Sequence, residues 1–212
     1  MKRKIIIAIF SLLALLSVSC NVVQFNKLNN YQNGIDFALD HYVSQYNAGS
    51  IYRSLEHALA DQKLSADSTH FVARDLGQLT QAHQDLTMLY NILNPNDEQI
   101  SPFGEKSLTS MYQDFQVFFE HLLTNHSKFV EGGADEQYIM LSDLDEDLLA
   151  GVHTITEITG KVETIQNDSY QNMPNTDHNA LKFFIKESNE YYHSQEVQDQ
   201  IKLIQSLIQT WQ

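Results

Sequence analysis

The sequence is poor in cysteine and in positive charge, and each shortage excludes a class of site. Its 212 residues include one cysteine, and 13 lysines and arginines stand against 27 acidic residues. One cysteine excludes an internal disulfide framework and any metal or iron–sulfur site built from four thiolates. A formal net charge of −14 leaves too few cations to neutralise a row of phosphates. Nucleic acid is therefore not an expected partner, and neither is anionic lipid held by charge alone.

The first 20 residues have the pattern of an export signal. Basic residues at positions 2–4 precede an apolar run over positions 5–16, and small residues then lead to Cys20. A basic start, a short apolar stretch and small residues before a cleavage point are typical of signal peptides. The run is too short for a membrane-spanning helix, which needs about 20 residues.

The end of this segment, Ser17-Val18-Ser19-Cys20, resembles that of bacterial lipoprotein signal peptides, in which cleavage leaves a lipidated cysteine at the mature N-terminus. That family usually has leucine three residues before the cysteine, whereas here the leucine is Leu16, one position earlier. The resemblance implies a signal peptide at residues 1–19 and an acyl chain such as palmitate on Cys20. It also implies export and attachment to the bacterial cell membrane through that lipid.

Two alternatives for this segment remain open. The small residues Ser17 and Ser19 also fit the rule for simple cleavage after Ser19, which would release a secreted protein. A cytoplasmic protein with a structural N-terminal run is the other alternative. The position of the only cysteine, at the place where lipid would be attached, favours the lipoprotein interpretation.

Beyond Cys20 the apolar residues recur at steps of three and four, which predicts an all-α fold. Helices are expected over about residues 35–46, 51–59, 72–93, 102–123, 144–165, 181–192 and 197–211, with a break at residues 193–194. No segment alternates with a period of two between hairpin turns, so no strand is expected. Five to seven helices with short connections predict an antiparallel helical bundle over residues 34–212. Residues 20–33 would be the anchor and a tether, or the start of the first helix.

Several residues mark expected helix ends and contacts. Ser50 is a predicted N-cap, and Pro102 stands at the predicted first position of the fourth long helix. Glycines at positions 132–133 are expected to end that helix, and Ser142 is expected to cap the next one. Within that next helix, Gly151 and Gly160 would let a neighbouring helix approach closely.

Histidine and glutamate supply the candidate metal or cofactor ligands. Glu190-x-x-His193 has the i, i+3 spacing that di-iron helical bundles use twice, but here it occurs once. Asp67-x-x-His70 is a poor second copy, because it stands at a predicted helix start. His83 occupies a core position of the helix over 72–93, where a hydrogen-bonded core histidine is the competing interpretation. The alternative metal site would use Glu190, His193 and His83, whereas the leading prediction includes no metal and no cofactor.

Other motifs have ordinary structural explanations. Asp143-x-Asp145-x-Asp147 begins like a calcium-binding loop, but Leu148 and Thr154 occupy the positions that need Gly and Glu. Acidic residues in a first helical turn explain this run instead. The aromatic residues of positions 112–119 have core spacing. No motif for nucleophilic catalysis is present, and no catalytic residue is predicted.

The leading functional prediction is a lipid-anchored protein of the cell envelope that acts as a non-catalytic binding or interaction module. Removal of the signal leaves 10 basic residues against 27 acidic ones, a net charge of −17, which favours a neutral or cationic partner. That partner would be a protein, a peptide or a glycan. The alternatives are the metal- or cofactor-binding bundle and an exclusion or immunity lipoprotein, which shields the cell from a phage or toxin.

Overall fold

The computed structural model describes residues 46–103, 107–129, 137–171 and 177–211, together with residues 24, 26, 34–36, 38, 41 and 43. The predicted signal peptide, Cys20 and most of the predicted tether and first helix lie outside the described residues. The chain divides into two compact units, Met1–His41 and Tyr42–Gln212. All features below belong to the second unit.

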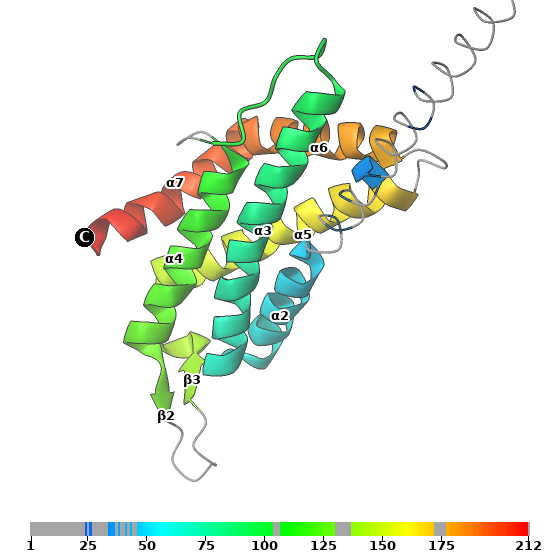
Figure 1. Cartoon of the computed structure of the whole chain (residues 1–212). Helices are drawn as coiled ribbons and strands as arrows, with labels where there is room; N and C mark the ends of the chain where they lie inside the picture. Colours follow the sequence, from blue (N-terminus) through cyan, green and yellow to red (C-terminus); the bar gives the residue numbers. More distant parts are fainter. Residues whose placement is uncertain are drawn as a thin grey trace, which may run out of the picture. The chain divides into compact units, whose positions relative to one another are not determined.

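Long helices make up most of this unit and confirm the predicted all-α helical bundle (Figure 1). They are α2 (Ala48–Asp61), α3 (Ala66–Leu93), α4 (Leu108–His126), α5 (Glu146–Gln171), α6 (Asp177–His193) and α7 (Gln195–Thr210). Their apolar stripes form one core, in which side chains of α3, α4 and α5 such as Leu79, Phe115 and Ile155 are fully buried. None of the described helices combines the length and the apolar character needed to cross a membrane.

Two helix pairs, α3 with α4 and α2 with α5, form the body of the unit. Helices α3 and α4 run antiparallel side by side, and α6 and α7 cross them (Figure 1). Helix α2 packs on α5, where a Cβ added at Gly160 would lie 2.8 Å from the ring of Tyr52. At Gly151 an added Cβ would lie 2.6 Å from the Phe118 ring of α4. Both glycines therefore permit the close helix contacts predicted for them.

Several helix ends differ from the prediction, because side-chain caps lie at other residues. Helix α2 is capped by Asn47, whose side chain accepts from the amide of Ser50 at 3.1 Å. Helix α4 begins after Ser107 rather than at Pro102, and it ends at His126, before the glycines expected to end it. Asp145, rather than Ser142, caps α5 by accepting from the Leu148 amide at 2.8 Å. The predicted break before residue 195 is confirmed, since α6 ends at His193 and Ser194 caps α7.

A small sheet contradicts the expectation that the chain has no strands. Strands β1 (Lys63–Ser65), β2 (Lys128–Phe129) and β3 (Gln137–Met140) pair antiparallel in the order β1-β3-β2. Leu64 lies opposite Ile139, and both are buried. The strands are two to four residues long, too short to show an alternating pattern in the sequence. A 3₁₀ turn, η1 (Leu141–Asp143), connects β3 towards α5.

Candidate functional site

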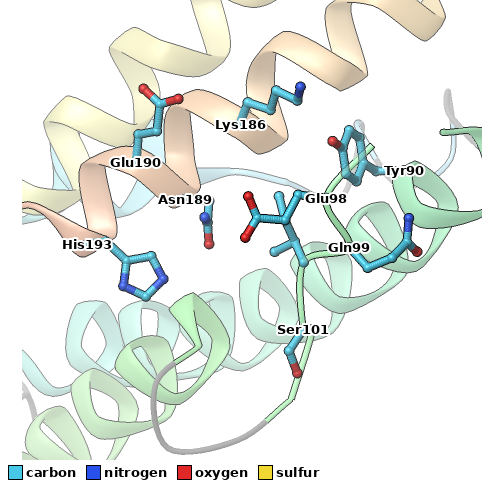
Figure 2. A pocket seen from close by; sticks show the side chains of 9 residues that line it. Tyr90, Glu98, Gln99, Ser101, Lys186, Asn189, Glu190 and His193 are labelled. Atoms are coloured by element: carbon cyan, nitrogen blue, oxygen red, sulfur yellow. The ribbon is translucent and has the colours of Figure 1, made fainter. Parts of the chain in front are cut away.

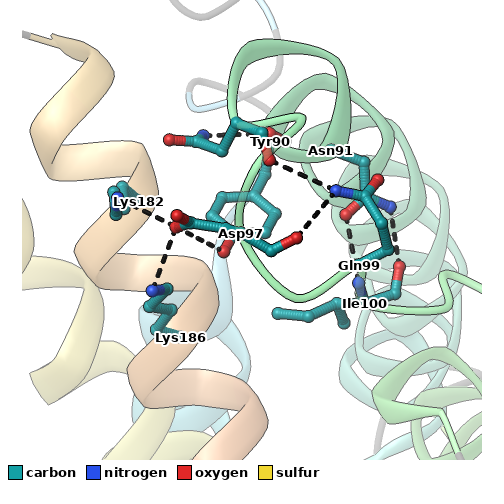
Figure 3. Close-up of polar contacts among 8 residues, drawn as sticks. Tyr90, Asn91, Asp97, Gln99, Ile100, Lys182 and Lys186 are labelled. Atoms are coloured by element: carbon teal, nitrogen blue, oxygen red, sulfur yellow. Dashed lines mark hydrogen bonds and ion pairs between the residues drawn. The ribbon is translucent and has the colours of Figure 1, made fainter.

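The segment after α3 is held in a defined conformation by hydrogen bonds back to the last turn of the helix. The Asn91 amide donates to the Ile100 carbonyl at 2.7 Å and accepts from the Ile100 amide at 3.1 Å. The backbone amide and side-chain amide of Asn94 both donate to the Tyr90 carbonyl at 2.9 Å. Residues 94–100 therefore have a fixed path over the end of the bundle (Figure 3).

Asp97 attaches this segment to α6. Its Oδ2 receives the ammonium groups of Lys182 at 2.8 Å and Lys186 at 3.0 Å, and the hydroxyl of Tyr90 donates to the same oxygen at 3.2 Å (Figure 3). Lys182 and then Lys186 lower the pKa of Asp97 to about 2, so this carboxylate stays ionised in ordinary conditions. Burial, with the bond to Asp97, raises the pKa of the Tyr90 hydroxyl. The cluster joins segments more than 80 positions apart in the sequence.

A pocket of about 340 Å³ lies beside this cluster, between residues 98–101 and one face of α6. We call it the α3–α6 pocket. It is lined by Tyr90, residues 98–101, Lys186, Asn189, Glu190 and His193. Figure 2 shows Glu98 directed across the pocket towards Asn189 and His193, while Glu190 points away from Glu98. Polar side chains from two segments far apart in the sequence thus line one open space.

The structure brings two of the three predicted ligand residues to this pocket and separates the third. Glu190 and His193, one helical turn apart on α6, both line the pocket and are exposed. His83 lies instead in the core, 4% exposed. Among the described residues, no group of three or more His, Cys, Asp or Glu side chains is arranged to hold a metal ion. The predicted combination of Glu190, His193 and His83 is therefore not assembled as one site.

His83 is surrounded by aromatic rings. The centroids of Tyr46, Phe184 and Tyr112 lie 5.9, 6.2 and 6.3 Å from its own. The hydroxyls of Tyr46 and Tyr112 are bonded to each other at 2.7 Å, and His83 Nδ1 has no hydrogen-bond partner among the described residues. Burial lowers the pKa of His83 to about 4. It is a neutral core histidine, but the hydrogen bond expected for it is missing at Nδ1.

The remaining predicted positions have local structural roles. Asp143 pairs with Lys128 at 3.0 Å, and Asp147 stands in the first turn of α5, beside the capping Asp145. The positions of Asp145 and Asp147 agree with the helix-start interpretation that the sequence favoured. Asp67 and His70 are exposed near the start of α3.

The aromatic residues of α4 are in the core, as predicted. Tyr112, Phe115, Phe118 and Phe119 are fully buried, as is expected for packing and not for an open ligand groove. Trp211, half-buried, stacks on His121 of α4 with ring centroids 3.7 Å apart and planes 6° from parallel. Burial, and then the neighbouring His126, lower the pKa of His121.

Sequence reasoning missed the residues that complete the pocket. Lys182, Lys186, Asn189 and His193 follow one another at steps of four, three and four, so a polar stripe on α6 is visible in the sequence. Nothing in the sequence indicates that residues 97–101 would lie against that stripe, because the contact crosses more than 80 positions.

Comparisons with known protein families, with curated proteins and with solved structures found no match to this chain.

Proposed function

We propose that this chain is a lipid-anchored protein of the bacterial cell envelope that acts by binding, with its ligand held in the α3–α6 pocket. One observation carries the binding function. The wall of the pocket is held in place by bonds made outside it, through Asp97, Asn91 and Asn94. The exposed residues Glu98, Glu190 and His193 line that pocket and make no hydrogen bond or ion pair with any described residue. A pre-formed wall with unused polar groups is typical of a binding site.

The hydroxyl groups of the pocket favour binding over catalysis, because both are hydrogen-bonded to groups that are not a catalytic base. The Ser101 hydroxyl donates to the Phe103 carbonyl at 2.7 Å, and the Tyr90 hydroxyl donates to Asp97. Neither is bonded to His193, although a serine or tyrosine nucleophile needs a base within hydrogen-bond reach. The pocket thus offers a histidine without an activated nucleophile.

The anchoring part of the proposal rests on the sequence of residues 1–20 and is tested separately. The full chain is expressed in a bacterium with lipoprotein processing and labelled with a palmitate analogue. We expect the wild type and the control Ser19→Ala to carry the label and to sediment with membranes, because alanine keeps a small residue before the cleavage point. Cys20→Ala should lose the label and leave the membrane fraction. An unlabelled wild type in the soluble fraction would refute the anchor.

The binding part is tested by photo-crosslinking in intact cells. A photoreactive amino acid replaces Asn189, which lines the pocket, or His57, an exposed residue of α2 that serves as the matched control. We expect an adduct, measured as an increase in the intact mass of the purified protein, at position 189 and none at position 57. No adduct at position 189, or equal adducts at both positions, would contradict binding in this pocket.

A further inference from the structure

We infer that the contact between α3 and α6 encloses a binding site for one internal water, held by the hydroxyls of Thr87 and Ser188 and by Nδ1 of His83. The site lies in the core of the bundle, and the inference does not depend on what the α3–α6 pocket binds. It rests on three buried polar atoms of two crossing helices.

These three atoms have no partner in the described part of the chain. Nδ1 of His83, Oγ1 of Thr87 and Oγ of Ser188 are buried and make no hydrogen bond with any described residue. Thr87 and Ser188 are 0% exposed, and His83 is 4% exposed. Most buried polar atoms in native proteins are paired, either with the protein or with an ordered water. A polar ligand is therefore expected where such atoms gather.

The two hydroxyls differ from other buried hydroxyls of the bundle. The side chains of Thr80, Thr156 and Ser169 donate to the backbone carbonyl four residues earlier, at 3.0, 2.7 and 2.6 Å. Thr87 and Ser188 also stand within long helices, where the same kind of acceptor is one turn away, and neither uses it. Their own helices therefore do not satisfy these two hydroxyls.

The positions of the three residues place them in one contact. Helices α3 and α6 cross, and the ring centroids of His83 and Phe184 lie 6.2 Å apart where they meet (Figure 1). Thr87 and Ser188 each stand four residues beyond this pair, and both are fully buried. Further along, Tyr90 of α3 lines the same pocket as residues of the last turns of α6. Thr87 and Ser188 thus lie between two places where the helices meet.

The spacing suits a single water molecule. Side chains four residues apart on a helix, such as those of His83 and Thr87, have Cβ atoms about 5–6 Å apart. A water that bonds at about 2.8 Å on each side joins two atoms up to about 5.6 Å apart. Thr87 and Ser188 are small side chains between larger ones, His83 with Phe184 on one side and Tyr90 on the other, which leaves room between the helices.

The chemistry of the three atoms favours water over an ion. None of them belongs to a charged group, because burial keeps His83 neutral. Both hydroxyls can donate or accept, and Nδ1 does one or the other according to the tautomer of the ring. An internal water typically makes about three hydrogen bonds to buried polar groups, which is the number of atoms that lack a partner here.

The first test counts long-lived waters by oxygen-17 relaxation dispersion on the full chain, purified in detergent. We expect Thr87→Val and Ser188→Ala each to lose one such water relative to the wild type. Thr87→Ser keeps the hydroxyl and should keep the water. The matched control is Thr80→Val, because that hydroxyl already donates to the Leu76 carbonyl, and its count should equal that of the wild type. An unchanged count in Thr87→Val or Ser188→Ala, or an equal loss in Thr80→Val, would overturn the site.

The second test uses the sign of the change in stability. A hydroxyl bonded to an internal water contributes to stability, so Thr87→Val and Ser188→Ala should each raise the equilibrium constant of urea unfolding about tenfold. A buried hydroxyl without any partner costs stability, and its removal would leave this constant unchanged or lower it. Either of those results would overturn the inference.

The double variant tests whether the two hydroxyls share one water. Both substitutions remove the same molecule, so the double variant should have an unfolding constant close to that of either single variant. A rise equal to the product of the two single effects would mean separate sites and would overturn the shared water.

Discussion

The buried histidine predicts a loss of stability in mild acid. His83 is fully enclosed, and burial lowers its pKa from 6.5 to about 4. Between these pH values the unfolded chain binds a proton at this residue and the folded chain does not. A falling pH therefore favours unfolding. The contribution of neutral His83 to the free energy of unfolding is fully present above about pH 6.5 and is lost as the pH approaches 4. At 1.36 kcal/mol per pKa unit, the loss amounts to about 3 kcal/mol.

The assay is urea unfolding of the wild type and of His83→Leu at a series of pH values. The series runs from neutral pH down to about 4, the pKa of His83 in the folded chain. Leucine suits the aromatic surroundings of Tyr46, Tyr112 and Phe184 and has no group to protonate. We expect the free energy of unfolding of the variant to fall with pH by about 3 kcal/mol less than that of the wild type. The difference between the two curves is the readout. Other groups contribute equally to both, including Asp114, whose pKa is raised by burial and which acts with the opposite sign.

The control is His70→Gln, a change at an exposed histidine on the same helix. It should leave the pH dependence of the wild type unaltered. The reasoning would be refuted if His83→Leu lost stability with falling pH as steeply as the wild type, because the proton uptake would then occur elsewhere.

Two further predictions test the packing. Gly160→Ala should lower the free energy of unfolding by about 1–3 kcal/mol in thermal or urea unfolding, because the new methyl group meets the ring of Tyr52 at 2.8 Å. In the control Gly77→Ala the nearest atom is at the end of a flexible glutamine side chain, so an unchanged or higher stability is expected, and equal losses in both variants would contradict the close α2–α5 contact. Trp211 is the only tryptophan and stacks on His121, so its fluorescence should change as His121 is protonated, with a midpoint below pH 6.5. A titration curve that persists in His121→Gln would show that the stack is not the source of the change.

The helices were predictable because their signals are local. Leu76, Leu79 and His83 of α3 follow one another at steps of three and four, and a buried stripe requires that spacing wherever the helix packs. The break between α6 and α7 was predictable for the same reason, since the apolar spacing changes phase there. Helix starts were less predictable, because residues such as Asn47, Ser107 and Asp145 all have neighbours that are equally able to cap.

The small sheet could not be predicted from the pattern. Strand β3 pairs with β1, from the segment between α2 and α3, and with β2, which follows α4, so each pairing depends on where the helices end. Strands of two to four residues have no periodicity of their own.

By itself the sequence determined the helical class, the acidic character and the export-signal pattern that ends at Cys20, because composition and short-range spacing are sufficient for each. It also placed Glu190 and His193 on one helix face. Only the tertiary structure decided that this face meets Asp97 and Glu98, and that His83 lies apart from it among aromatic rings. The physical reason is distance along the chain. A pocket between segments more than 80 residues apart depends on how whole helices pack, and spacing within one helix has no information about its neighbour.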